Sequence, residues 1–258
     1  MLKHKYIWII SLLSVFLIIA CNYFYDVSLS YLIIVFLFWL GFTSWGSFDI
    51  RLNYFIKTYS KGPKSNQKTI ALTFDDGPHP ITNQVLDLLD KFDFKATFFC
   101  IGKNIETYTE IFKRIHSEGH TIGNHTYSHT SKMGFLPKKK IIQEITICNK
   151  IIYNSIGIKP KLYRPPFGVT NPNIAEALKE LKMDVIGWNV RSLDTILTNE
   201  STILNRVLPK IDSGSIVLFH DNSERTVRVL EQLLHFMKHN KIESVTVNEL
   251  LNLEPYEN

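Results

Sequence analysis

Short apolar runs of strand length alternate with segments whose apolar residues recur at helical spacing, and this alternation is what most constrains the fold. Val85, Leu88 and Leu89 show the helical spacing in the segment that follows the first run. Repeated strand–helix units predict parallel strands with helices outside them, either as a barrel or as a doubly wound sheet. The expected strands are 70–74, 96–100, 121–123, 161–163, 185–188, 216–219 and 245–247.

Two helix ends also have sequence signals. Gly119 follows the segment 105–118 in the manner of a helix C-cap. Asn173 is expected to cap a helix that runs to Lys182. These signals support the division of the chain into alternating units.

Reactive polar residues gather at one end of the expected strands. In both parallel architectures, ligands bind beyond the C-terminal ends of the strands. Polar side chains follow those ends at six positions: Asp75, Asp76, His125, Arg164, Asn189 and His220. The sequence therefore predicts a site at this edge of the sheet, which explains two adjacent carboxylates after an apolar run.

The segment "HTYSH" places His125 and His129 four residues apart. On a helical turn that spacing lets both imidazoles reach one ion. Either Asp75 or Asp76 would complete a two-histidine, one-carboxylate site, but hardly both, because neighbouring strand residues point to opposite faces. A divalent metal lowers the pKa of bound water from 15.7 to about 7–9, and the second carboxylate can then accept its proton.

Other polar residues at this edge suit hydrolysis. His220 is available as an acid for a leaving group. Arg164, in a diproline turn, can pair with Asp75 and keep it ionised, although a purely structural ion pair is the alternative. In "WNVRSLD", Trp188 supplies an aromatic wall or a core residue, and Asp194 a carboxylate that could orient His220.

The N-terminal part predicts a membrane helical hairpin. Residues 6–24 and 29–48 are uncharged and apolar, and each approaches the roughly 20 residues that cross a bilayer. Cations precede the first run and follow the second, so the positive-inside rule favours the cytoplasm for both ends and for the following domain. Cleavage of the first run as a signal would instead favour the outer face. Cys21 in "IIAC" resembles a lipoprotein box, but a cysteine within a membrane helix fits the second apolar run better.

Composition excludes several classes of protein. The 258 residues are 45% hydrophobic and 21% charged, as in a folded protein rather than a disordered one. The net charge of +5 comes from scattered cations, and no basic stripe interleaved with aromatics predicts nucleic-acid binding. Three cysteines give no disulfide framework.

Four segments in this order resemble the polysaccharide deacetylase family, the NodB-homology domain of carbohydrate esterase family 4. They are "TFDDGP" at 73–78, "HTYSH" at 125–129, "RPPFG" at 164–168 and "VLFH" at 217–220. The resemblance covers residues 68–251. It implies a distorted (β/α) barrel and metal-dependent removal of N-acetyl groups from amino sugars. Zinc is the metal that it implies, with cobalt or a similar ion as a substitute.

The resemblance also implies roles for individual residues. By motif position, Asp75 resembles the general base, and Arg164 the residue that positions it. Asp76, His125 and His129 resemble the three metal ligands.

The remaining roles concern the leaving group and the substrate. His220 resembles the general acid, and Asp194 the residue that tunes it. Leu218 resembles part of the pocket for the acetyl methyl group, and the backbone N–H of Phe167 resembles the oxyanion donor.

Three positions depart from the family pattern. Phe167 replaces the usual tyrosine, Arg191 stands where an acid is common, and Thr195 where tryptophan is common. These changes lie at the expected substrate groove, so they bear on sugar specificity more than on catalysis.

The expected organisation is a two-helix membrane anchor (1–50), a polar linker (51–67), the NodB-homology domain (68–251) and a tail (252–258). The expected activity is N-deacetylation of a GlcNAc-containing glycan at the cell membrane, and a cytoplasmic domain would favour a lipid-linked or oligosaccharide precursor. Alternatives are a deformylase or an O-acetyl esterase of the same family. The alternative from another class is a catalytically silent carbohydrate-binding membrane protein.

Overall fold

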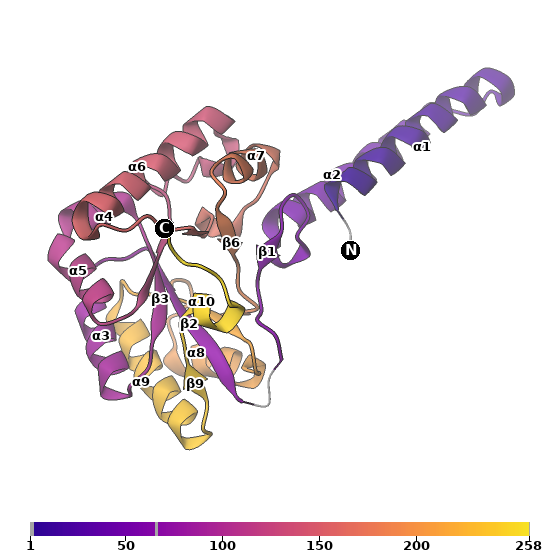
Figure 1. The fold of residues 1–258 in the computed structure, drawn as a ribbon. Helices are drawn as coiled ribbons and strands as arrows, with labels where there is room; N and C mark the ends of the chain where they lie inside the picture. The colour runs from indigo at the N-terminus through magenta and orange to yellow at the C-terminus, as the bar shows by residue number, and fades with distance from the viewer. Residues whose placement is uncertain (1–2, 65–66, 258) are drawn as a thin grey trace.

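The barrel consists of a curled parallel sheet with helices on its outer face (Figure 1). The computed structural model describes residues 3–64 and 67–257. The main path of the sheet has the order β1-β6-β5-β4-β3-β2-β8-β7, and β9 pairs with β2. The strands are β1 Thr58–Tyr59, β2 Thr69–Asp75, β3 Ala96–Cys100, β4 Thr121–Asn124, β5 Leu162–Tyr163, β6 Asp184–Ile186, β7 Val190–Arg191, β8 Ile216–His220 and β9 Glu243–Ser244.

Within the described residues, two α-helices precede the sheet, one follows its last strand, and the others connect strands in the alternation that the sequence predicts. The expected distorted barrel is confirmed as a half-barrel. The α-helices are α1 His4–Tyr25, α2 Tyr31–Phe48, α3 Thr82–Lys91, α4 Gly102–Thr107, α5 Thr109–Ser117, α6 Lys138–Ile156, α7 Pro172–Glu180, α8 Glu200–Val207, α9 Glu224–His239 and α10 Val247–Leu251. The short 3-10 helices in the described ranges are η1 Ile50–Leu52, η2 Met133–Phe135, η3 Pro166–Gly168 and η4 Leu208–Lys210.

The two faces of the central strand β2 have different partners. Ile70, Leu72 and Phe74 belong to the large core cluster that includes apolar residues of α3 and α9. Successive strand residues point to opposite faces, so Thr73 and Asp75 lie on the inner face of the barrel. The inner face thereby brings a carboxylate to the C-terminal edge of the sheet.

Three sequence predictions differ from the structure. Asn171, not Asn173, caps α7, because its side chain accepts a hydrogen bond from the N–H of Ile174 and Pro172 suits the first helical position. The segment 105–118 is not one helix but the end of α4 followed by α5. The strand expected at 245–247 is wrong, since β9 ends at Ser244 and Thr246 forms a capping box for α10.

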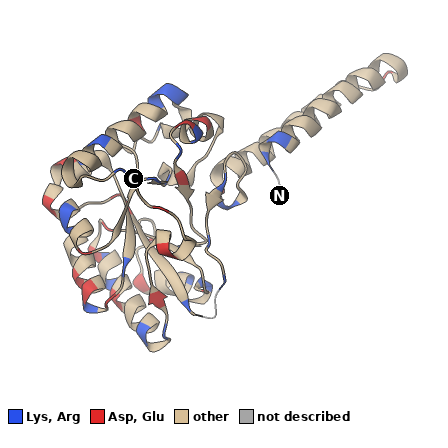
Figure 2. Ribbon diagram, viewed as in Figure 1, with Lys and Arg blue, Asp and Glu red and all other residues tan. Residues whose placement is uncertain are grey.

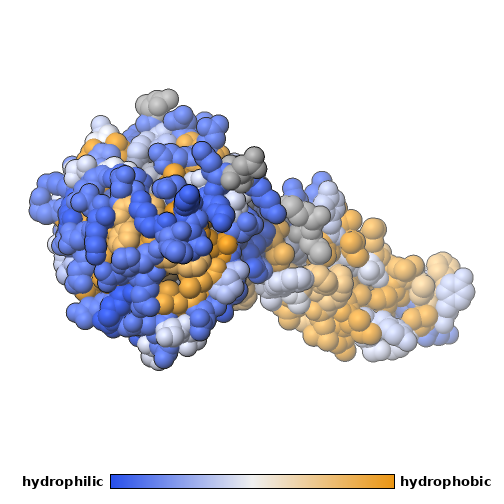
Figure 3. Space-filling model, turned by 90° about the horizontal axis from the view of Figure 1, so that it is seen from below, coloured by the Kyte–Doolittle hydropathy of each residue, from blue (hydrophilic) through white to orange (hydrophobic). Residues whose placement is uncertain are grey.

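The N-terminal helices form a hairpin that extends away from the barrel (Figure 1). Both are long and apolar enough to cross a membrane, and only 11% of the most apolar stretch of α1 and 6% of that of α2 are buried. The space-filling view shows the exposed apolar surface of the hairpin beside the hydrophilic surface of the barrel (Figure 3). The two helices are therefore not core helices of the barrel.

The base of the hairpin is attached to the barrel by several contacts. The carbonyl of Ser47 accepts a hydrogen bond from the N–H of Thr170, at 3.0 Å. Ile50 is buried, and its carbonyl accepts a hydrogen bond from Thr58 Oγ1 at 2.6 Å. Strand β1, which lies within the expected polar linker 51–67, pairs with β6. The expected tail also has a contact, because the hydroxyl of Tyr256 accepts a hydrogen bond from the N–H of Ile122.

Candidate active site and metal centre

Asp75 and Asp76 both reach the same side of the barrel edge. Asp75 is the last residue of β2, and Asp76 follows with a φ of +74°. This left-handed conformation breaks the strand alternation, so the expectation that the two carboxylates point to opposite faces is wrong. Nε2 of His125 lies 3.9 Å from Asp75 Oδ2 and 3.5 Å from Asp76 Oδ1. Gly77 comes next, where a Cβ atom would lie 2.2 Å from Asp221 Oδ2, so a larger residue does not fit.

His125 and His129 converge in an irregular loop after β4, not on the helical turn that their spacing suggested. Thr126 and His129 have φ angles of +68° and +48°. The side chain of Asn124 accepts a hydrogen bond from the N–H of Thr126, and Thr126 Oγ1 accepts one from the N–H of His129. The two imidazole centroids lie 4.8 Å apart. Local side-chain hydrogen bonds therefore give the geometry that a helix was expected to give.

Asp76, His125 and His129 offer a donor set that fits a divalent metal. One ligand atom from each lies within 4.8 Å of the others, and Asp76 Oδ1 is 3.4 Å from Nε2 of His129. Among the described residues, this buried oxygen has no hydrogen-bond partner. Nδ1 of His125 donates to the carbonyl of Arg164 at 2.8 Å, which leaves the Nε2 lone pair free for an ion. An unsatisfied buried carboxylate oxygen between two imidazoles is the arrangement that a bound cation would complete.

Arg164 fixes the second carboxylate of the pair. Its Nη1 donates to Asp75 Oδ1 and to Thr73 Oγ1, each at 2.8 Å, and its other nitrogens donate to the carbonyls of Ile186 and Gly187. The guanidinium lies 4.1 Å from the centre of the Phe99 ring and is completely buried. The planar guanidinium of Arg164 is fixed by four acceptors, and it therefore holds the Asp75 carboxylate in one orientation.

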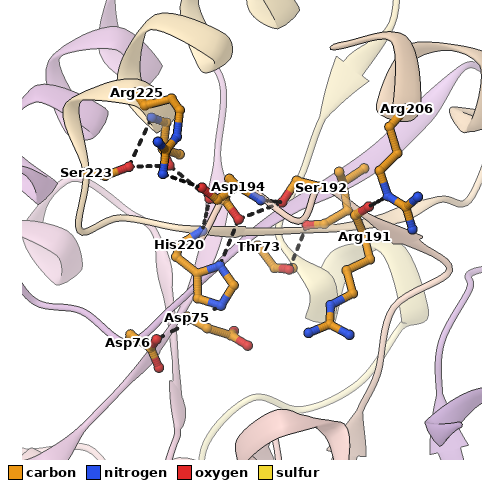
Figure 4. Close-up of polar contacts among 12 residues, drawn as sticks. Thr73, Asp75, Asp76, Arg191, Ser192, Asp194, Arg206, His220, Ser223 and Arg225 are labelled. Carbon is orange, nitrogen blue, oxygen red and sulfur yellow. Dashed lines mark hydrogen bonds and ion pairs between the residues drawn. The ribbon is translucent and has the colours of Figure 1, made fainter. Parts of the chain in front are cut away.

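His220 lies between Asp194 and the two carboxylates, Asp75 and Asp76 (Figure 4). Nδ1 of His220 donates to Asp194 Oδ1 at 2.9 Å, and its Nε2 lies 4.0 Å from Asp76 Oδ2. Burial by itself would lower the pKa of His220, but the hydrogen bond and the charge of Asp194, with smaller contributions from Asp75 and Asp76, raise that pKa to about 9. The imidazole therefore keeps a proton at neutral pH.

Sequence reasoning missed the residues that hold Asp194. Ser192 Oγ and Thr226 Oγ1 donate to its carboxylate at 2.7 and 2.9 Å, and Arg225 donates to its backbone carbonyl. Burial would raise the pKa of Asp194, but the hydrogen bonds from His220 and Ser192 and the charge of the imidazole outweigh burial and lower it. Thr226 comes from the first turn of α9, and only the fold brings it to this carboxylate.

Of the three residues expected to contact substrate, the structure places Phe167 directly beside a metal ligand. The Phe167 ring is 4.9 Å from that of His129, and Phe167 has a φ of +60°. Trp188 is partly buried and packs against two core clusters, as the core alternative predicts, and its role as an aromatic wall stays a prediction. Leu218 is buried on β8 two residues before His220, and therefore on the same face of the sheet.

Asn189 does not join the site. Its side chain instead accepts from the N–H of Ile216 and donates to Ser215 Oγ. A further buried acid was missed, namely Asp221, which accepts a hydrogen bond from Thr82 Oγ1 at 2.6 Å. Burial raises the pKa of Asp221 to about 7, against the opposing effect of that hydrogen bond. The adjacent "HD" pair at 220–221 was the only local signal for it.

Comparison with known proteins gives consistent results. The family profile described as polysaccharide deacetylase matches residues 62–186. The peptidoglycan-N-acetylmuramic acid deacetylase PdaC of Bacillus subtilis is 37% identical over 186 residues, which are 72% of this chain and 39% of the relative. A peptidoglycan-N-acetylglucosamine deacetylase of Bacillus cereus is 35% identical over 193 residues, covering 72% of this chain and 90% of the relative.

Solved structures share the fold. The crystal structure of the Bc1960 peptidoglycan N-acetylglucosamine deacetylase superimposes with a TM-score of 0.72 at 32% identity, over 77% of this chain and 94% of that one. The chain spans about two fifths of the length of the first curated relatives that it matches, at 39% and 40%. The profile match contains three of the four motifs, at 73–78, 125–129 and 164–168, and together with these relatives it confirms the resemblance. The chain belongs to the polysaccharide deacetylase family.

Proposed function

We propose that the chain is a membrane-anchored, metal-dependent hydrolase that removes N-acetyl groups from a GlcNAc-containing glycan. The observation that carries the proposal is the convergence of Asp76, His125 and His129 beside an Asp75 that Arg164 orients. Relatives named as peptidoglycan deacetylases support the same substrate class.

The chain's own residues supply the proton transfers of amide hydrolysis. Asp75 accepts a proton from the water that attacks the acetyl carbonyl carbon. His220, protonated because Asp194 raises its pKa, donates a proton to the nitrogen as the carbon–nitrogen bond breaks. The products are acetate and a free amine. The N–H of Phe167 stabilises the charge on the carbonyl oxygen, and Leu218 contacts the acetyl methyl group.

Asp76, His125 and His129 would hold a divalent cation, zinc in our proposal with cobalt as a substitute. It would supply positive charge that favours ionisation of water and polarises the carbonyl. Burial and the charge of His125 lower the pKa of His129. The neutral imidazole that results is the form that binds a metal.

The hairpin α1–α2 would hold this site at the membrane. Lys3 precedes α1 and Lys5 lies in its first turn, while Arg51 and Lys57 follow α2, which favours a cytoplasmic barrel by the positive-inside rule. A cytoplasmic site would act on a precursor rather than on mature cell wall.

Activity is tested with the full chain in detergent, stripped by a chelator and reconstituted with zinc. Chitin oligomers, peptidoglycan, acetyl-xylan and a lipid-linked amino sugar serve as substrates, and release of acetate or formate is measured. Zinc-dependent acetate release from an amino sugar is expected. Formate release or cleavage of acetyl-xylan alone would favour a deformylase or an esterase, and no release at all would favour a silent binding protein.

Two variants separate the metal from the base. Asp75→Asn should lower kcat by a factor of about 10²–10⁴ while zinc stays bound, since general base catalysis contributes that much. His125→Ala should lose zinc in elemental analysis, whereas His239→Ala, an exposed histidine on α9, should retain it. Normal zinc content in His125→Ala would contradict the proposed metal centre.

A further inference from the structure

A cationic pocket of about 410 Å³ opens between the end of α2 and the barrel. Its lining includes four cations and one carboxylate, which leaves a net charge of +3: Arg51, Arg191, Arg206, Lys210 and Asp49. Arg51 donates to both oxygens of Asp49, at 2.8 and 2.7 Å, so this carboxylate is already neutralised. The size and the charge of the pocket fit a small, multiply charged anion.

Within the part of the chain that the structure describes, neither Arg191 nor Lys210 takes part in an ion pair. Arg206 donates through Nε to the backbone carbonyl of Arg191 at 2.9 Å, and this contact brings the two arginines together (Figure 4). Several positive charges facing one cavity repel each other, and a bound anion would remove that cost. Arginine forks match the oxygens of a phosphate group particularly well.

The pocket adjoins the candidate active site. Arg191 on β7 is the register partner of Leu218 on β8, so both side chains lie on the inner face with His220. His220 lies two residues beyond Leu218 on β8, and Arg191 lies on the neighbouring strand. The Cα atoms of Arg191 and His220 are therefore roughly 8 Å apart. The Arg191 guanidinium is 5.8 Å from the ring of Trp188, and its side chain extends to the same side as that of His220 (Figure 4).

The same pocket also touches the candidate membrane helix. Trp45 and Phe48, in the last turn of α2, line it and expose 54% and 74% of their surface. Cations of the barrel lie near the base of the hairpin, whereas the hairpin itself is almost free of charge (Figure 2). With α2 in a bilayer, the pocket would lie at the depth of lipid phosphates.

Phe48 is shared with a second pocket, of about 590 Å³ and mostly apolar. Its lining includes Phe167, next to His129, and Phe135, which exposes 91% of its surface. An apolar surface therefore connects α2 to the metal ligands, beside the cationic pocket.

We propose that the cationic pocket binds the phosphate or diphosphate of a lipid-linked amino sugar, while the hydrocarbon chain of this lipid contacts the apolar pocket beside α2. This inference rests on the proposed deacetylase function and specifies its substrate. A sugar whose anomeric carbon bears phosphate carries its acetamide on the neighbouring carbon, so a phosphate site close to His220 suits the reaction. Arg191 is then a specificity-determining residue for an anionic substrate.

The turnover experiment uses the full chain in neutral phosphatidylcholine vesicles with zinc. The substrates are polyprenyl diphosphate N-acetylglucosamine, uridine diphosphate N-acetylglucosamine and the neutral oligomer chitotetraose. The lipid-linked sugar is expected to have the highest kcat/KM. Equal or better use of the soluble nucleotide sugar would overturn the lipid assignment, and preference for chitotetraose would overturn the phosphate site.

Charge removal tests the pocket directly. The double variant Arg191→Gln/Lys210→Gln should lower kcat/KM for the lipid-linked sugar at least tenfold more than for chitotetraose, mainly through KM. Lys150→Gln, an exposed lysine on α6, should change neither. Equal losses on both substrates would overturn the proposal. In a second comparison, phosphatidylglycerol vesicles replace the phosphatidylcholine vesicles. If they stimulate turnover of chitotetraose as much as turnover of the lipid-linked sugar, the effect is a general lipid effect and the proposal is overturned.

A binding experiment keeps the two proposals distinguishable. Binding of the lipid-linked sugar to vesicles containing the Asp75→Asn chain is measured without turnover, with inorganic pyrophosphate as competitor. We expect pyrophosphate to compete with the lipid-linked sugar for binding. We also expect the two pocket substitutions to weaken binding at least tenfold, even if no substrate is hydrolysed. Binding that neither pyrophosphate nor the substitutions weaken would overturn the phosphate site.

Discussion

Nη1 of Arg164 lies 2.8 Å from Oδ1 of Asp75, and both side chains are buried on the inner face of the barrel. The two opposite charges compensate each other inside the barrel, and Arg164 also donates to Thr73 Oγ1 and to two backbone carbonyls of the sheet edge. The ion pair therefore both stabilises the folded protein and fixes the orientation of Asp75, the candidate base.

Arg164→Met should destabilise the protein, because it leaves Asp75 buried without its cation. Breaking a buried ion pair from one side costs about 3–5 kcal/mol of unfolding free energy. Urea unfolding of the detergent-solubilised chain measures this change. Arg228→Met, which removes an exposed ion pair with Glu200, is the matched control and should have a much smaller effect. Equal effects would show that Asp75 does not depend on Arg164.

Asp194→Asn should shift the pH dependence of kcat/KM. If His220 acts as an acid, activity falls as pH rises through its pKa, which Asp194 raises to about 9. Removing the negative charge of Asp194 lowers that pKa, so the alkaline limb should move to lower pH. A pH–rate profile from pH 6 to 10 measures it. A limb that stays in place in the variant would exclude His220 as the titrating acid.

His120 should make stability depend on pH below neutrality. It is buried, its Nδ1 accepts a hydrogen bond from the N–H of Ala96, and burial lowers its pKa to about 4. In the unfolded chain the imidazole binds a proton below about pH 6.5, whereas in the folded chain it does so only near pH 4. The free energy of unfolding should therefore fall as pH drops from 6.5 to 4, by on the order of 1 kcal/mol per pH unit.

The variant His120→Asn isolates this effect. Its side-chain oxygen can still accept from Ala96, but it does not titrate. Urea unfolding at pH 7, 6 and 5 should show a smaller loss for the variant than for the unmodified chain. Parallel curves would mean that His120 is not held neutral in the fold.

The side of the membrane is tested by protease treatment of spheroplasts that express the chain with a C-terminal tag. Cations at both ends of the hairpin predict a protected tag. The tag should become accessible only after the membrane is permeabilised. Cleavage in intact spheroplasts would place the barrel on the outer face.

The sequence by itself determined the sheet, the strand-end site and the apolar hairpin. The apolar run Ile70–Phe74 indicates a buried strand, a period of 3.6 residues identifies the buried face of a helix, and parallel strands bring their C-terminal ends together. The reactive residue types at those ends were therefore visible without coordinates. The apolar runs were equally visible, because crossing a bilayer requires length and lack of charge.

Only the tertiary structure decided how these residues meet. The positive φ of Asp76, the loop that joins His125 to His129, and the contacts of Asp194 with Ser192 and Thr226 depend on partners distant in sequence or on non-repeating backbone. The grouping of Arg191 with Arg51 depends on the docking of the end of α2 against the barrel. Periodicity specifies the face of a strand, but the choice among long-range neighbours is made by the packing of the whole chain.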